Sequence, residues 1–255
     1  MLLALTLSLL AVAPAGQEGD AQAFTSLLDA QGNVIADGRY AQEVREGVLH
    51  IDARYDFPDG RVVDEKAVVR LRPQIEQQSW EWSERKGSQL IRSYEVDFLA
   101  RKAVATRVDQ HKRWKEDIEV EPGKTFAGIA FVTAIKALRA QLAPGQSVEL
   151  RAVAFTPKPR TAKVTVRRDG RDAVPMAGRT IPADRYTVHP EIPAIAKLFV
   201  SAPDQHIWLF ADAPAAFLRA QGPLAEPKDP VITVNLIPGP SAHAQSRAGP
   251  RPRRR

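Results

Sequence analysis

Apolar and polar residues alternate over several stretches of the chain, most clearly from 49 to 57. Successive side chains of a strand point to opposite faces of a sheet. The alternation therefore predicts a strand with one apolar face, formed by Leu49, Ile51, Ala53, Tyr55 and Phe57. The turn residues Pro58-Asp59-Gly60 follow, and alternation resumes from 63 to 71, where Glu65 interrupts the apolar face. These two segments predict a long β-hairpin.

The pattern continues through four more segments. Trp80 and Trp82 share a face, Lys86-Gly87 predicts a turn, and apolar residues alternate again from 90 to 98. Shorter segments at 104–108 and 114–120 complete the series. Six strands joined by short turns predict an antiparallel meander.

The period changes between Phe126 and Leu142, where apolar residues recur at helical spacing and Ala143-Pro144-Gly145 ends the segment. A single amphipathic helix in a β protein needs an apolar surface to cover, and the concave face of the sheet is the expected one. The predicted fold class is therefore mainly β: a curved antiparallel meander, an open or half barrel, wrapped around one amphipathic helix.

Strands resume after the helix. Segments 148–155 and 163–167 are expected to be strands, and Asp169-Gly170 is a strong signal for a two-residue hairpin turn. Further strands are expected around Tyr186 and Val188, at 195–201 and at 206–211. A last strand at 231–237 can close the sheet.

The two ends of the chain differ from the part between them. Residues 1–23 are predicted to be a signal peptide and short linker, because an apolar run ends in Ala13-Pro14-Ala15, with a second candidate cleavage site at Ala21-Gln22-Ala23. No Lys or Arg precedes the run, and an uncleaved anchor or a buried helix is the alternative. A single β-rich domain is expected over 24–240, followed by a disordered Arg/Pro-rich tail over 241–255. The expected location is periplasmic, or otherwise exported.

Charge excludes nucleic acid as a partner. The 255 residues include 36 basic and 30 acidic ones, a formal charge of +6, but five of the arginines lie in the tail. Without them the chain is nearly neutral, unlike a nucleic-acid binder with one basic face. The tail is either a weak tether to an anionic envelope surface or a solvated end with no partner.

Signatures of catalysis and metal binding are missing. The chain has no cysteine, which excludes disulfides and thiolate chemistry. Gly123-Lys124-Thr125 lacks the first glycine of a P-loop, since Ile118 stands there, and His189-Pro190-Glu191 lacks the thiolate ligands of a zinc deaminase. The prediction is a protein that is not an enzyme, with no catalytic residues, no metal site and no cofactor.

One repeated tripeptide keeps an enzymatic alternative open. Asp109-Gln110-His111 recurs as Asp204-Gln205-His206. If the fold brings the two together, their imidazoles and carboxylates could hold zinc or share a proton. Otherwise they are solvated residues beside turns.

The aromatic residues of the predicted meander are the best candidates for a binding site. Trp80 and Trp82 project from one side of a strand, where they fill the core, line an apolar cavity, or form an exposed platform for sugar rings. If the sheet is concave there, the candidate ligand-binding residues are Tyr55, Phe57, Trp80, Trp82, Tyr94 and Phe98.

Three short segments give the chain a resemblance to known proteins: Asp37 to Tyr40, Leu90 to Phe98 and Ile207 to Pro214. Together with the order of elements, they resemble an uncharacterised family of bacterial exported proteins with the lipoprotein-carrier-like (LolA/LolB-type) open β-barrel, over about 32–237. The resemblance implies a curved sheet around a helix with an apolar groove between them, which in such carriers holds acyl chains. No ligand-contact motif of a true carrier is identifiable.

Two functions are therefore expected. The first is a non-enzymatic envelope protein that binds a lipid or another apolar small molecule in a cavity between helix and sheet. The alternative is a structural or partner-binding envelope protein whose core is full and which presents an exposed apolar edge.

Overall fold

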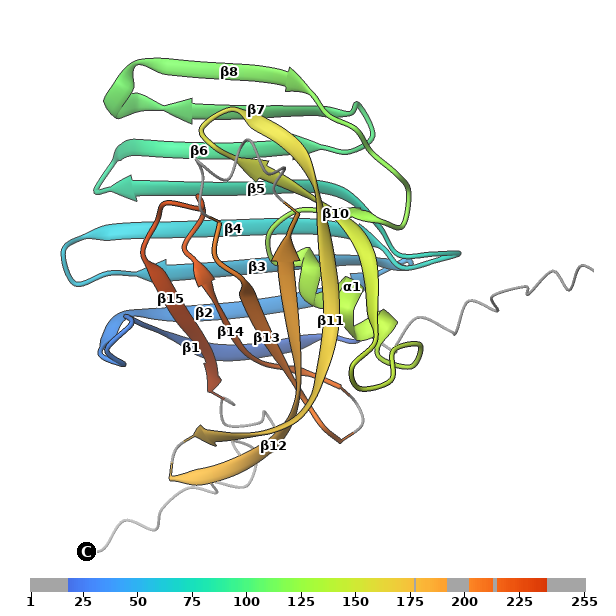
Figure 1. Cartoon of the computed structure of the whole chain (residues 1–255). Coiled ribbons are helices and arrows are strands. Elements are labelled where there is room, and N and C mark those ends of the chain that lie inside the picture. Colours follow the sequence, from blue (N-terminus) through green and yellow to red (C-terminus); the bar gives the residue numbers. More distant parts are fainter. Residues whose placement is uncertain (1–17, 177, 192–201, 213–214, 238–255) are drawn as a thin grey trace, which may run out of the picture.

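The computed structural model describes residues 18–176, 178–191, 202–212 and 215–237. One continuous sheet of 15 strands dominates it, in the order β8-β7-β6-β5-β4-β3-β2-β1-β15-β14-β13-β12-β11-β10-β9. The sheet folds back on itself, so that the strands of its second half cross in front of those of its first half (Figure 1). The core lies between the two halves.

The predicted meander forms most of the first half and ends at the edge strand of the sheet. The six alternating segments become six consecutive antiparallel strands, as predicted: β3 (Val48–Asp56), β4 (Arg61–Arg70), β5 (Glu76–Lys86), β6 (Gln89–Asp97), β7 (Lys102–Arg107) and β8 (Lys112–Asp117). Two strands that precede them were not predicted, β1 (Ala21–Leu28) and β2 (Val34–Arg45). A short 3₁₀ turn, η1 (Val108–Gln110), joins β7 to β8.

The helix is shorter than its pattern predicted. Helix α1 covers Ala130–Leu138 rather than 126–142, because Thr125–Phe126 forms β9, the parallel edge strand beside β10. Residues 130–135 of α1 are buried in the core, on the inside of the folded sheet (Figure 1). At its end, Arg139 and Arg168 both donate to the fully buried carboxylate of Asp184, which ties the helix to the second half of the sheet.

The second half of the sheet corrects one turn prediction. Its strands are β10 (Ser147–Phe155), β11 (Pro159–Met176), β12 (Arg179–Pro190), β13 (Gln205–Phe210), β14 (Phe217–Pro223) and β15 (Val231–Ile237). The Asp169-Gly170 hairpin was wrong: both residues lie inside β11, where the register shifts between Arg168 and Gly170. The positive φ of Gly170 serves a bulge, and Asp169 accepts hydrogen bonds from Arg185 and Thr187 of β12.

The last strand joins the two halves. β15 pairs with β14 on one side and with β1 on the other, so both ends of the described chain lie in the middle of the sheet. The two edges, β8 and β9, do not pair with each other, although β11 contacts β7 and β8. Thr161 and Arg151 bridge this seam by bonding to Glu119, which follows β8. The architecture is an open barrel, as predicted.

Several predictions lie outside the described residues. These are the apolar run of the signal peptide within 1–17, the strand at 195–201, and the tail at 241–255. β1 begins at Ala21, so cleavage after Ala23 would remove the first three residues of that strand. Of the helices in the described part of the chain, none has the length and apolar character needed to cross a membrane.

Candidate functional site

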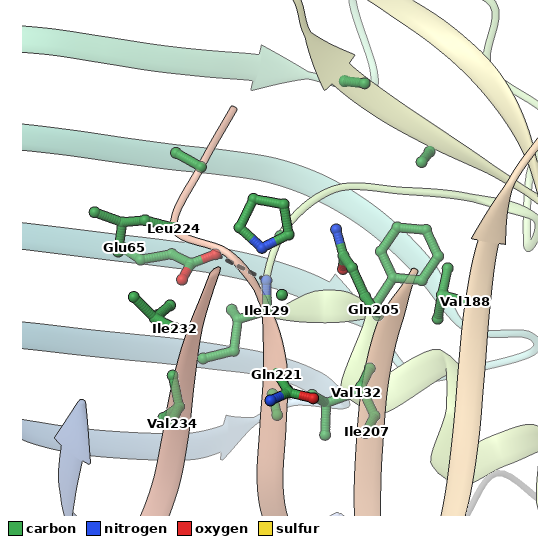
Figure 2. A pocket seen from close by; sticks show the side chains of 18 of the residues that line it. Glu65, Ile129, Val132, Val188, Gln205, Ile207, Gln221, Leu224, Ile232 and Val234 are labelled. Carbon is green, nitrogen blue, oxygen red and sulfur yellow. Dashed lines mark hydrogen bonds between the residues drawn. The ribbon is translucent and has the colours of Figure 1, made fainter. Parts of the chain in front are cut away.

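A cavity of about 260 Å³ lies between the two halves of the sheet, beside the start of α1. One wall is aromatic and comes from the first half, with Tyr40, Tyr55, Trp80 and Trp82. The opposite wall comes mainly from β12–β15. Its aliphatic side chains Val188, Ile207, Ile232 and Val234 point inward (Figure 2), and the polar Gln205, His206 and Gln221 also belong to it. At ~30 Å³ per water-sized atom, the space holds about nine non-hydrogen atoms.

Small residues alternate with large ones across the aromatic wall. The registers of β2 to β5 place Tyr40, Ala53, Glu65 and Trp82 side by side in one row. Ala53 leaves space between Tyr40 and Glu65. In the next row Gly38 faces Tyr55, and a Cβ on it would lie 2.6 Å from the Tyr55 ring. The absence of a side chain on Gly38 thus makes room for Thr25 and Tyr55, both of which line the cavity.

Glu65 is the residue that interrupts the apolar face of β4, and its carboxyl group reaches the cavity. Its Oε1 accepts two hydrogen bonds, from Trp80 Nε1 at 2.8 Å and from the backbone N–H of Ile129 at 2.8 Å (the second is drawn in Figure 2). Its Oε2 has no hydrogen-bond partner among the residues described. Glu65 is the only Asp, Glu, Lys or Arg among the described lining residues.

A glycine holds this arrangement together. Gly128 has φ +53, and a Cβ on it would lie 2.0 Å from Trp80 Nε1 and 2.2 Å from Glu65 Oε1. Only glycine combines the left-handed conformation with so close an approach. Gly128 thereby lets the Ile129 N–H reach the carboxyl at the start of α1.

Burial controls the electrostatics of the cavity. Burial raises the pKa of Glu65 above its usual range, while the hydrogen bonds from Trp80 and Ile129 oppose the rise. Burial also raises the pKa of Tyr40 and of Tyr55, and the nearby Glu65 adds to both shifts. Both phenols are therefore neutral at physiological pH, and the Tyr40 hydroxyl donates a hydrogen bond to Gln42 Oε1 at 2.6 Å.

A loop from the second half of the sheet covers one side of the cavity. Leu224, Ala225 and Pro227 line it, and they lie in the connection between β14 and β15. The loop is fixed internally by Asp229, whose Oδ2 accepts the backbone N–H groups of Ala225 and Glu226 at 3.0 Å each.

Buried ion pairs attach this loop to the first half of the sheet. Arg92 bonds Glu84 at 2.7 Å and Asp229 at 2.9 Å, and its side chain is 9% exposed. Arg107 bonds Glu226 at 2.8 Å, and the Tyr94 hydroxyl donates to the same carboxylate. The ion pairs therefore connect β5, β6 and β7 to the loop that covers one side of the cavity.

The structure separates the six candidate binding residues into two groups. Tyr55, Trp80 and Trp82 line the cavity. Phe57, Tyr94 and Phe98 are buried but do not line it: the Phe57 ring lies under the Arg61 guanidinium, and the Tyr94 ring contacts Phe155 and Trp82. An exposed sugar platform at Trp80 and Trp82 was wrong as an alternative, because the two residues are 5% and 3% exposed.

The two Asp-Gln-His segments lie on different elements. Asp109 accepts a hydrogen bond from Arg107 in the turn between β7 and β8. Asp204 lies just before β13 and bonds His189, whereas His206 lies on β13 and bonds Thr187. Within the described ranges, no group of three His, Asp or Glu side chains is arranged to hold a metal ion. Gln205 and His206 line the cavity on the side opposite Glu65.

Comparison with known proteins bears on the fold. No protein-family model matches the chain, and no curated protein does. Among solved structures, the chain is similar to a β-barrel-like protein of the domain of unknown function DUF1849 from Brucella abortus. The TM-score is 0.51 at 11% identity, over 88% of this chain and 98% of the other. A DUF1089 family protein from Pseudomonas aeruginosa matches at a TM-score of 0.36 and 16% identity, over 69% of this chain and 84% of the other.

The first of these likenesses shows a barrel-like fold. At 11% identity it supports the architecture implied by the sequence resemblance and says nothing of a ligand. A relationship to the LolA/LolB-type carriers is not part of what it shows.

Proposed function

We propose that the protein is a non-enzymatic, exported binding protein that takes up a small apolar molecule, or the end of an acyl chain, between the two halves of its barrel. The observation that supports this proposal is the cavity of about 260 Å³ with aromatic and aliphatic walls. Ligand sites are typically concave, mostly apolar and equipped with a few polar groups. Here the polar side chains of the lining include Glu65, Gln205, His206 and Gln221.

The volume bounds the ligand. About nine non-hydrogen atoms fit, which corresponds to a C6 to C8 chain or a substituted benzene ring. A whole diacyl lipid exceeds this space, so a lipid would insert only one chain end. The apolar N-terminal run with its candidate cleavage sites supports export, and a periplasmic location is part of the proposal.

Saturable binding of a neutral apolar probe tests the proposal. We expect the full chain to bind 1-hexanol with one site in isothermal titration calorimetry. Ala220 faces the cavity between Ile207 and Val234, and Ala220→Leu fills about a third of the space. This variant should abolish binding without loss of stability.

Ala41→Leu is the matched control, since Ala41 lies opposite Asp52 on the outer face of the barrel. It adds the same atoms outside the cavity and should leave 1-hexanol affinity unchanged. An absence of any saturable uptake by the unmodified chain would reject the proposal.

The alternative of a structural protein with a full core is less well supported. It predicts no cavity and an exposed apolar edge. The large apolar side chains exposed in the described part of the chain are Phe24, Val34 and Leu99, and they are scattered over β1, β2 and the β6–β7 turn. Isolated exposed apolar residues are normal on protein surfaces.

A further inference from the structure

The inference concerns the second oxygen of the Glu65 carboxyl group, and it rests on the proposed function. Oε1 already anchors the Trp80 indole and the Ile129 N–H. That structural role needs one acceptor oxygen, which a glutamine side chain would supply without an ionisable group in an apolar space. The carboxylate therefore provides something more than the anchor, and its open atom is Oε2.

The surroundings of Glu65 favour a positively charged partner. No described side chain neutralises the carboxylate, and Glu65 is the only Asp, Glu, Lys or Arg on the described lining. Aromatic rings surround the same space, including Tyr40, Tyr55 and Trp80. The negative faces of aromatic rings attract ammonium groups, most strongly where water is excluded.

The aliphatic part of the opposite wall, away from Gln205, His206 and Gln221, constrains the rest of the ligand. Ile207, Ile232 and Val234 offer no hydrogen-bonding side chain, so the part of a ligand that meets them is apolar. A molecule that fits both walls has one polar head at Glu65 and a short hydrocarbon body.

We propose that the cavity selects a small amphiphilic amine, whose ammonium group donates a hydrogen bond to Glu65 Oε2 and lies among the rings of Tyr40, Tyr55 and Trp80. A charge-assisted N–H···O bond is stronger than the bond from a neutral hydroxyl. An anionic ligand such as a fatty acid meets the same carboxylate with repulsion. The site is therefore a cation-selective apolar pocket rather than a fatty-acid pocket.

Three ligands with the same hydrocarbon chain test this selectivity. The full chain is titrated at pH 7.5 with n-hexylamine, 1-hexanol and hexanoate, with affinity measured by calorimetry. We expect n-hexylamine to bind at least ~10-fold more tightly than 1-hexanol, and hexanoate to bind most weakly. Glu65→Gln should remove the preference for n-hexylamine over 1-hexanol.

The outcomes separate this proposal from the proposed function. If none of the three ligands binds, the proposed function itself fails. If 1-hexanol binds and n-hexylamine binds no better, the pocket stands but the amine selectivity is refuted. Tighter binding of hexanoate refutes it as well. These comparisons use the unmodified protein, so they decide the matter even if Glu65→Gln does not fold.

Discussion

The contact between Gly128 and the Glu65–Trp80 pair predicts an unusually large cost for a single added methyl group. Gly128→Ala places a Cβ 2.0 Å from Trp80 Nε1 and 2.2 Å from Glu65 Oε1, at φ +53. The left-handed conformation alone costs a non-glycine residue about 1–2 kcal/mol. Both neighbours must also move apart, which breaks at least one hydrogen bond to a charged group, worth about 1.5–3 kcal/mol. The expected loss of unfolding free energy is about 3–5 kcal/mol.

Gly145→Ala is the control that isolates the backbone contribution. Gly145 has φ +84, and a Cβ added there would have no neighbouring atom within 4 Å, so the substitution carries the conformational cost without a clash. Its expected cost is about 1–2 kcal/mol.

Urea unfolding followed by tryptophan fluorescence measures both variants. The reasoning requires Gly128→Ala to cost about 2–3 kcal/mol more than Gly145→Ala. Equal costs would refute it, because Glu65 and Trp80 could not then lie against Gly128. The tryptophan emission maximum of folded Gly128→Ala should also differ from that of the unmodified chain and of Gly145→Ala, because the Trp80 indole loses its hydrogen bond to Glu65.

Three further predictions concern buried charges. Because burial raises the pKa of Glu65 in the folded state, the protein should lose stability as pH rises from the unfolded value near 4.5 through the folded value. The stability of Glu65→Gln relative to the unmodified chain should therefore increase from pH 4 to pH 9 in urea unfolding. A difference that does not change with pH would contradict the raised pKa of Glu65. Arg92→Met removes the cation shared by Glu84 and Asp229, while Glu84 keeps its ion pair with Arg61. The variant should cost up to about 3–5 kcal/mol in urea unfolding, with faster hydrogen exchange in the 224–230 loop. Asp184→Asn should speed hydrogen exchange in α1, because the two arginines at its end lose their anion; unchanged protection of α1 would count against that role.

The sequence predicted the meander because its strands bury only one face. From β3 to β8 most inner residues are apolar and most outer ones are polar, so the period of two is visible despite the inward Glu65, Glu84 and Arg92. β1, β2 and β14 were missed for a physical reason. β2 carries Gly38 on its inner face, where the side chains of Thr25 and Tyr55 fill the space that a side chain on residue 38 would take. β14 ends in Gly222 and Pro223 beside a proline-rich loop. Their apolar alternation is too weak to detect.

The turn at Asp169-Gly170 was wrong because the same two residues also suit a bulge. A positive φ at glycine serves either structure, and the choice depends on the neighbouring strand. Here β12 offers Arg185 and Thr187 to the Asp169 carboxylate. Such cross-strand partners are invisible in a local pattern, and so are the ion pairs of Arg92 with a loop 137 residues away along the chain.

The site was half visible in the sequence. Trp80 and Trp82 were expected to face one side because of their spacing, and Glu65 was visible as a polar residue on an apolar face. What the pattern does not contain is the neighbour of Glu65 in space: Ile129 belongs to the turn before α1, 64 residues later in the chain. Without the hydrogen bond from Ile129, the sequence gives no structural role to a single glutamate on an apolar strand face.

The placement of Glu65 is also the strongest argument that the cavity has a purpose. A void can arise wherever small residues such as Ala53 meet across a sheet, and an apolar void needs no polar group. This void contains a carboxyl group that its own environment disfavours, held in one orientation by an indole, a backbone N–H and a glycine at positive φ. The buried carboxyl group of Glu65 opposes stability, yet its contacts hold Oε2 free within the cavity. This fits the recognition of a ligand better than the filling of a core.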